Sequence, residues 1–157
     1  MHPTIAVIGA GQASADEERR ATDVGRLLAE AGAVVVCGGL GGVMGAVAEG
    51  VAGAGGTCVG LLPGSDRADG HPALTLALPT GMGEGRNLLV VRAADAVIAI
   101  GGGYGTLSEI GFARKLGRTV VGLGTWSVRQ EGEDAACHVV AVEDAAEAVL
   151  LAMAACS

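Results

Sequence analysis

Three glycine-rich turns, each lying between a short apolar run and the start of a helical pattern, constrain the fold of this chain more than any other feature. The turns read GAGQAS, GGLGGVMG and GGGYGT, and they begin at Gly9, Gly38 and Gly101. Each turn follows a run rich in β-branched residues, which is typical of a strand buried on both faces of a parallel sheet. Because strand, glycine turn and helix recur in this order, the sequence predicts an α/β protein.

The remaining apolar runs extend this pattern along the whole chain. They predict a doubly wound, Rossmann-like fold of about seven mostly parallel strands with helices on both faces. The expected strands cover residues 4–10, 33–37, 57–62, 74–78, 94–100, 119–124 and 138–142. The expected helices cover residues 15–31, 43–52, 85–93, 106–116 and 144–155. No linker or internal repeat divides the chain, so we expect residues 1–157 to form one domain.

Two expected helices begin with the sequence form of a capping box. Ser14 is followed three residues later by Glu17, and Thr106 is followed in the same way by Glu109. In such a box, the hydroxyl and the carboxylate each accept a hydrogen bond from the other residue's backbone N–H. We therefore expect one helix to start just after Ser14 and another just after Thr106.

Charge and hydropathy narrow the range of partners. The net charge of −7 and the presence of only one lysine argue against a nucleic-acid groove, which needs a basic stripe. No apolar run reaches the ~18–20 residues of a membrane span. The N-terminal MHPTIAVIGAG has no basic segment before a long apolar one, so the sequence indicates a cytoplasmic protein. The mean hydropathy of +0.50 and the apolar segment 88–100 predict a subunit interface in a homodimer.

The cysteines and histidines are scattered along the chain without the spacing of a metal site. The cysteines are Cys37, Cys58, Cys137 and Cys156, and the histidines are His2, His71 and His138. No C-x-x-C pair occurs, and two of the cysteines fall inside expected strands. The sequence therefore predicts buried free thiols and no metal centre.

The stretch GGGYGTLSE, residues 101–109, is the strongest candidate for ligand binding. A loop of this kind directs free backbone N–H groups and the positive end of a helix dipole at one point, where an anion fits. It predicts a phosphate site formed by Gly102, Gly103, Tyr104, Gly105 and Thr106. The two earlier turns end at the same edge of the expected sheet and add Gly9, Gly11, Gly38, Gly39 and Gly41.

Three common nucleotide and cofactor chemistries fit this sequence poorly. Gly9, Gly11 and Ser14 only approximate a dinucleotide fingerprint, and no acidic residue follows the second strand. The glycine turn at residues 38–45 lacks the lysine of a P-loop. The single lysine, Lys115, lies late in an expected helix, which suits a solvated surface lysine better than a Schiff base with pyridoxal phosphate.

The chain resembles the LOG-type proteins of the SMF/DprA-LOG superfamily. GGGYGTLSE resembles their signature P-G-G-x-G-T-x-x-E, and GGLGGVMGAVAEGV is similar to their second glycine-rich turn and helix. The family includes cytokinin riboside 5′-monophosphate phosphoribohydrolases, long mislabelled lysine decarboxylases, and the molybdenum-cofactor carrier proteins share the fold. The resemblance extends from Ile5 to about Leu150. It implies a homodimer whose site lies near the subunit interface.

The resemblance also implies catalytic residues, with some departures. In the hydrolases, an arginine in an E-R-K segment acts together with the signature glutamate, and the matching positions here are Arg86 and Glu109. Gly101 replaces the signature proline, and Asn87 replaces the lysine after the arginine. The sequence around Arg86 and around the glycine loop resembles the carrier-like bacterial branch of the family more closely. We therefore expect no required cofactor, and a nucleotide, phosphate or molybdopterin-type compound as the ligand.

Several alternatives stand at this point. Glu109 either contacts a ligand or caps its helix, Arg86 either binds an anion or is a surface charge, and Tyr104 either covers a base or shields the loop. An enzyme with these residues would hydrolyse the N-glycosidic bond of a nucleoside 5′-monophosphate to free base and ribose 5-phosphate. Glu109 would then act on the ribose hydroxyls or the attacking water, and Arg86 on the phosphate or the leaving base. A carrier would hold a pterin phosphate without chemistry, and a nucleotide sensor would need the same loop.

Overall fold

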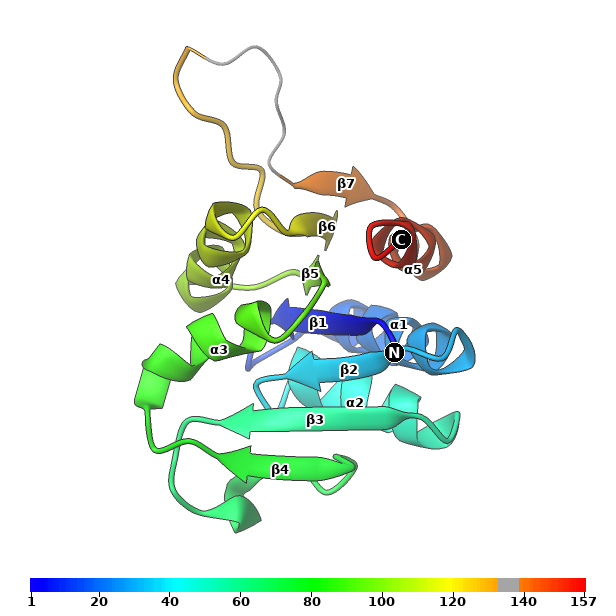
Figure 1. The fold of residues 1–157 in the computed structure, drawn as a ribbon, viewed down its shortest axis with the longest axis vertical. Helices are drawn as coiled ribbons and strands as arrows, with labels where there is room; N and C mark the ends of the chain where they lie inside the picture. Colours follow the sequence, from blue (N-terminus) through cyan, green and yellow to red (C-terminus); the bar gives the residue numbers. More distant parts are fainter. Residues whose placement is uncertain (133–138) are drawn as a thin grey trace.

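The structure is a computed structural model that describes residues 1–132 and 139–157. Its centre is a seven-stranded sheet with the strand order β4-β3-β2-β1-β5-β6-β7, and each strand pair in the described residues is parallel (Figure 1). The strands are β1 (Thr4–Gly9), β2 (Val34–Cys37), β3 (Thr57–Leu62), β4 (Leu76–Pro79), β5 (Ala96–Ile100), β6 (Thr119–Leu123) and β7 (Val140–Val142). The α/β fold expected from the sequence is thus confirmed.

The helices cover both faces of the sheet, as a doubly wound fold requires. They are α1 (Ala15–Glu30), α2 (Val43–Gly53), α3 (Arg86–Arg92), α4 (Tyr104–Lys115) and α5 (Ala145–Ala154). Figure 1 shows α3 and α4 on one side of the sheet and α1, α2 and α5 on the other. Successive residues of β1 belong to different cores: Ile5 and Val7 pack with the three-helix side, and Ala6 and Ile8 with α3 and α4. A strand buried on both faces reads as a continuous apolar run, which is why it was recognisable in the sequence.

The order of the strands reverses between β1 and β5. From β1 the chain moves outward through β2 and β3 to β4, and α3 then returns it to β5, which pairs with the other edge of β1. The later strands β6 and β7 continue outward from β5. In open α/β sheets, ligands bind beyond the carboxyl ends of the strands at such a reversal. A ligand site is therefore expected beside the residues that follow β1 and β5.

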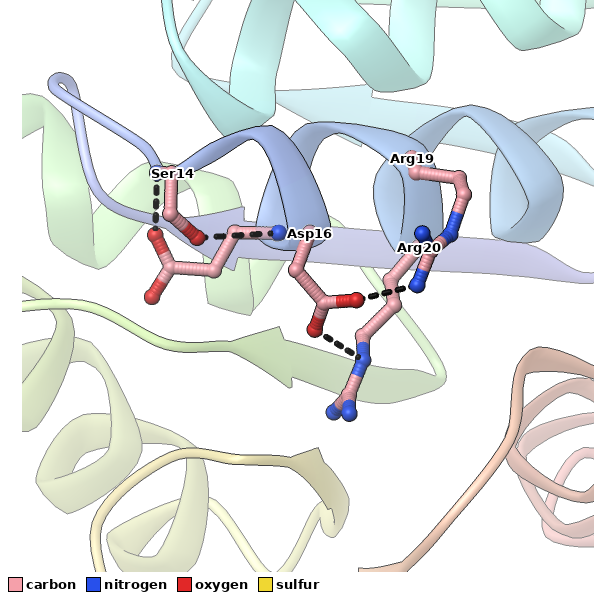
Figure 2. Close-up of polar contacts among 5 residues, drawn as sticks. Ser14, Asp16, Arg19 and Arg20 are labelled. Atoms are coloured by element: carbon pink, nitrogen blue, oxygen red, sulfur yellow. Dashed lines mark hydrogen bonds and ion pairs between the residues drawn. The ribbon is translucent and has the colours of Figure 1, made fainter.

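The start of α1 follows the predicted capping box. The Ser14 hydroxyl accepts a hydrogen bond from the Glu17 N–H at 3.2 Å, and a Glu17 carboxylate oxygen accepts one from the Ser14 N–H at 2.9 Å (Figure 2). Both partners lie within one turn of each other, so this cap depends on local sequence alone.

The start of α4 differs from the prediction. The helix begins at Tyr104, two residues before the predicted cap, and its N-cap residue is Gly103, with no side-chain cap. Thr106 therefore lies inside the first turn, and the predicted capping box of Thr106 and Glu109 is wrong. The backbone of Gly102, with φ +100°, turns the chain so that Gly103 already enters the helix.

The apolar segment 88–100 is largely buried within the subunit, so its composition needs no interface to explain it. Val90 and Val91 are buried against the subunit's own core, and the residues of β5 are fully buried between β1 and β6. The large apolar side chains that remain exposed lie elsewhere, and Leu150 on α5 is 68% exposed. The homodimer thus stays a prediction, without this segment as its support.

The thiols of Cys37 and Cys58 are fully buried on neighbouring strands, with their Sγ atoms 3.9 Å apart at hydrogen-bond distance and no disulfide between them. Cys137 and His138 lie outside the described residues. Within the described residues, no group of three or more histidine, cysteine, aspartate or glutamate side chains is placed to hold a metal ion. The described helices include none that is both long and apolar enough to span a membrane.

Candidate anion site between β1 and β5

A cavity of about 300 Å³ opens at the carboxyl ends of β1 and β5, where the strand order reverses. Seven of the predicted site residues line it together: Gly9, Gly11, Arg86, Gly103, Gly105, Thr106 and Glu109. Ala10, Met44 and Asn87 complete the lining. The arginine and the glutamate come from α3 and α4, which pack against each other on one face of the sheet. Residues far apart in the sequence therefore meet in one cavity.

The glycine loop after β5 needs glycine for steric reasons. Gly101 and Gly102 have φ values of +56° and +100°, which L side chains rarely adopt. A Cβ on Gly102 would lie 2.2 Å from Thr106 Oγ1, whereas one on Gly103 would meet no atom within 4 Å. The second glycine of the loop thus closes the turn, and the third leaves open space beside the cavity.

Two side chains that follow β6 hold the loop in place. Thr125 Oγ1 donates a hydrogen bond to the Gly101 carbonyl at 2.6 Å, and Trp126 Nε1 donates one to the Gly103 carbonyl at 3.0 Å. With their carbonyl groups bound on this side, the loop residues keep a defined orientation toward the cavity. Neither residue could be recognised as part of the site from the sequence, because their role depends on the pairing of β5 with β6.

The first turn of α4 lines the cavity with unpaired backbone donors. The first N–H groups of a helix have no partner inside the helix, and here no side chain caps them. The helix dipole adds about half a positive charge at the same end. Gly105 has no side chain to cover these groups, so the cavity wall formed by α4 favours a negative charge.

Arg86 brings a buried positive charge to this cavity. Its side chain is only 8% exposed, and Nε donates to the Leu61 carbonyl at 2.9 Å, Nη2 to the Gly38 carbonyl at 3.4 Å and Nη1 to Asn87 Oδ1. These partners are all neutral. None of the ion pairs formed by the described residues includes Arg86. Among the described residues, Glu109 is the one acidic side chain in the lining of this cavity, and burial disfavours its ionised form, so the cavity is suited to an anionic ligand.

Glu109 lies in the same cavity, and the pKa of its carboxyl group is higher than usual. Burial raises the pKa of its carboxyl group to about 7, and the nearby Arg86 charge opposes this rise only in part. At neutral pH the group is therefore present in both protonated and ionised forms, as a general acid or base requires. Because the predicted capping box does not form, the helix-capping alternative for Glu109 is excluded.

The glycines of the second turn, Gly38, Gly39 and Gly41, do not line this cavity, although the sequence predicts them as site residues. Gly38 does not line the cavity but lies beside the Arg86 guanidinium, and Gly39, with φ +77°, lies against Leu62 and Gly60 of β3. Gly41 lines a separate hollow with Arg19 and His71. Gly38 thus positions the arginine without lining the cavity, and residues 38–45 reach the cavity wall only through Met44.

The remaining predicted residues lie at the rim or outside. Tyr104 is 82% exposed, and its ring packs on Trp126 with centroids 5.6 Å apart and planes tilted by 39°. Gly102 lines a neighbouring hollow, not this cavity. Lys115 is the last residue of α4 and exposed, at the opposite end of the helix from the cavity. A lysine there cannot act on a ligand held beside Glu109.

Asn87 is a cavity residue whose role was not predictable from its residue type alone. In the sequence it stands out only as a departure from the hydrolase pattern, where a lysine follows the arginine. Its side chain is 8% exposed and its Oδ1 accepts a hydrogen bond from Arg86 Nη1. The sequence indicates this role only through the position of Asn87 next to Arg86. An amide at this position can accept a hydrogen bond from the guanidinium and orient it, whereas a lysine would repel it.

The fold and the glycine-loop cavity define a LOG-like Rossmann domain. The chain belongs to the SLOG cluster4 family, whose family model matches residues 2–149. It is also similar to an uncharacterised protein of Archaeoglobus fulgidus, with 45% identity over 124 residues that cover 76% of this chain and 78% of that protein.

Two solved structures resemble the chain over nearly their whole length. The molybdenum cofactor binding protein of the phototrophic bacterium Rippkaea orientalis superposes with a TM-score of 0.90 at 29% identity, covering 100% of this chain and 99% of that chain. The molybdenum cofactor carrier protein MCP of Chlamydomonas reinhardtii has a TM-score of 0.86 at 30% identity, covering 99% and 98%. The resemblance to carrier-like proteins stated from the sequence is thus matched by the structures.

Proposed function

We propose that this chain is a carrier that binds the phosphate ester of a planar heterocycle, with a pterin phosphate of the molybdenum-cofactor type as its ligand. The phosphate lies between Arg86 and the first turn of α4. The observation that carries the proposal is the burial of Arg86 without an ion-pair partner among the described residues. An anion in the cavity would compensate this charge and accept hydrogen bonds from the uncapped helix end.

The two structural relatives support the carrier role. Both are molybdenum-cofactor binding or carrier proteins, and both match this chain across nearly its full length. The sequence around Arg86 and the glycine loop is closer to the carrier-like branch than to the plant-type hydrolases. The ligand is cargo in this proposal, so no reaction step is required of the cavity.

The test compares two arginines of the same helix. Arg86→Met removes the buried charge, and Arg92→Met removes an exposed charge at the other end of α3. Calorimetry with inorganic phosphate should show binding by the wild type and by Arg92→Met, and a loss of at least about tenfold in Arg86→Met. The freshly purified wild-type protein is also examined for a bound fluorescent pterin. Absence of phosphate binding by the wild type would refute the proposal.

A second variant keeps this test independent of folding. Gly103→Val adds a side chain where a Cβ meets no atom within 4 Å, so the fold is retained while the open space beside the cavity is filled. Under the proposal, this variant melts like the wild type and binds phosphate weakly. Unchanged affinity in Gly103→Val would contradict the placement of the phosphate at the glycine loop.

One observation favours hydrolysis as a second candidate function. Glu109, with a pKa of about 7, lies in the cavity with Arg86, and these are the two residues that match the hydrolase pair. We propose that, if the protein is an enzyme, it cleaves the N-glycosidic bond of a nucleoside 5′-monophosphate. Chromatography of a nucleotide panel after incubation distinguishes the two functions, because a carrier releases no base.

A further inference from the structure

A second cavity of about 270 Å³ lies beyond the glycine loop, beside the residues that follow β6 and β7. Its lining includes Arg20, Gly124, Thr125, Trp126, Ser127 and Glu143, none of which was a predicted site residue. A hollow lined by Gly101 and Gly102 shares four of these residues, Gly124 to Ser127. The second cavity therefore adjoins the hollow beside Gly101 and Gly102, and the next residue of the glycine loop, Gly103, lines the Arg86 cavity.

Arg20 supplies a positioned guanidinium to the second cavity. Its Nε donates to Asp16 Oδ2 at 2.9 Å, while the other oxygen of Asp16 binds Arg19 (Figure 2). Figure 2 shows the two terminal nitrogens of Arg20 directed away from Asp16. A Cβ on Gly124 would lie 3.4 Å from Arg20 Nη1, so the absence of a side chain there keeps this nitrogen accessible to the cavity. The Nε edge of the Arg20 guanidinium is thus held by Asp16, and its two terminal nitrogens remain for a ligand.

Trp126 and Glu143 supply two further kinds of contact. The indole of Trp126 is fixed by its hydrogen bond to Gly103 and by the ring of Tyr104, so it forms an oriented apolar wall. Glu143 follows β7 directly and is exposed at the same cavity. No ion pair of the described chain joins it to Arg20. The cavity therefore combines an aromatic wall, a pair of guanidinium donors and a carboxylate acceptor.

This combination matches one class of planar ring. A 2-amino-4-oxopyrimidine, the ring common to guanine and the pterins, carries a carbonyl acceptor on one side and N–H and NH₂ donors on the other. Arginine binds such a carbonyl and its neighbouring ring nitrogen in guanine, and a carboxylate binds the N–H donors. Adenine has an amino group in place of the carbonyl, so it would place a donor against Arg20.

We propose that the second cavity binds the ring of the ligand and selects 2-amino-4-oxo heterocycles over adenine. This inference rests on the proposed function, because it takes the phosphate of the same ligand to lie beside Arg86. Arg20 donates to the ring carbonyl, Glu143 accepts from the ring N–H groups, and Trp126 covers one face. The glycine loop lies between the two ends of the ligand, where side chains would obstruct it.

The experiment measures affinities for GMP, AMP and inorganic phosphate by calorimetry. The variants are Arg20→Met and Glu143→Gln, with Arg19→Met as the matched control, since Arg19 binds the same aspartate but does not line the second cavity. We expect the wild type and Arg19→Met to bind GMP about tenfold more tightly than AMP. Arg20→Met and Glu143→Gln should lose this preference while their phosphate affinity stays within about twofold of the wild type.

The outcomes separate this inference from the proposed function. Equal affinity for GMP and AMP in the wild type, with phosphate still bound, would overturn the ring site and leave the anion site standing. An equal loss in Arg19→Met and Arg20→Met would also overturn it, because the effect would then be one of general charge. Failure of the wild type to bind phosphate or either nucleotide would overturn both. Glu143 is exposed, so its variant tests the ring site even if Arg20→Met folds poorly.

Discussion

Gly38 leaves the space that the Arg86 guanidinium occupies. A Cβ on Gly38 would lie 2.8 Å from Arg86 Nη2 and 2.5 Å from Met44 Sδ, both of which are closer than such atoms approach. The Gly38 carbonyl also accepts a hydrogen bond from the same nitrogen at 3.4 Å. The glycine after β2 therefore positions the arginine of the candidate site, 48 residues further along the chain.

Gly38→Ala should weaken anion binding while the fold persists. The three atoms nearest to the added methyl group belong to the ends of the flexible Arg86 and Met44 side chains, so we expect these side chains to move and the backbone to stay in place. We expect phosphate affinity to fall by about tenfold in calorimetry. Gly53→Ala, a glycine in α2 whose Cβ would meet nothing within 4 Å, serves as the control and should bind normally. Wild-type affinity in Gly38→Ala would show that the guanidinium position is unimportant.

The second and third glycines of the loop should respond differently to substitution. Gly102→Ala introduces a contact of 2.2 Å with the buried Thr106 at a φ of +100°, and should cost of order 1–3 kcal/mol of stability. Gly103→Ala meets no neighbour and should melt close to the wild type. Thermal unfolding monitored by circular dichroism measures both. Equal melting temperatures would contradict the tight turn at Gly102.

Stability should depend on pH through Glu109. Its pKa is raised from 4.5 unfolded to about 7 folded, so the folded state binds the proton more tightly. The resulting stabilisation is complete below about pH 4.5 and is lost as pH rises through about 7, with a size of up to roughly 3 kcal/mol. Urea unfolding at several pH values should show this decline in the wild type relative to Glu109→Gln. A constant difference between the two proteins across that range would refute it.

Phosphate affinity should fall over the same pH range. Below about pH 7 the Glu109 carboxyl group is protonated and can donate a hydrogen bond to an anion, whereas the ionised form above it repels one. In Glu109→Gln the affinity should depend less on pH, because glutamine carries no charge. Calorimetry with phosphate at pH 6 and pH 8 checks this, after allowance for the titration of phosphate itself in the same range.

If base release occurs, Glu109→Gln should reduce it by orders of magnitude with little loss of stability. The change removes the carboxylate but retains the side-chain shape, and no capping bond is lost because Glu109 does not cap α4. The assay incubates wild type and variant with nucleoside 5′-monophosphates and with the matching nucleosides. The nucleosides should react poorly, because they lack the phosphate. Equal rates in the two proteins would remove Glu109 from the reaction.

We also propose a homodimer, and suggest the exposed side of α5 as its interface. Leu150 is 68% exposed next to an apolar groove lined by Leu27, Val149 and Met153. Light scattering at micromolar concentration should give a dimer, and Leu150→Glu should shift it toward the monomer. A wild-type monomer would contradict the dimer, and a dimer that persists in the variant would place the interface elsewhere.

Much of the fold was accessible from local sequence. The strands were recognisable because buried parallel strands are continuous apolar runs, and β3 has the predicted bounds. The cap of α1 was predictable because Ser14 and Glu17 are three residues apart and bind each other. Such features depend on neighbours within one turn or one strand, so the sequence alone determined them.

The start of α4 and the role of the second glycine turn required the tertiary structure. The helix begins at Tyr104, directly after a loop whose Gly101 and Gly103 carbonyl groups are bound by Thr125 and Trp126, which follow β6. A sequence can contain the residues of a capping box although the box does not form. Here the loop before α4 is also bound by residues about 20 positions away in the sequence, which the local pattern does not include.

For the candidate site, too, some features were predictable from the sequence and others depend on the tertiary structure. Arg86, Glu109 and the glycine loop could be recognised in the sequence, and the loop could be placed directly after a buried strand. Only the tertiary structure decided that Arg86 is buried, because its partners are carbonyl groups at the ends of β2 and β3, distant in the sequence. The same burial raises the pKa of Glu109, since desolvation depends on everything that packs around a group and not on its neighbours in the chain.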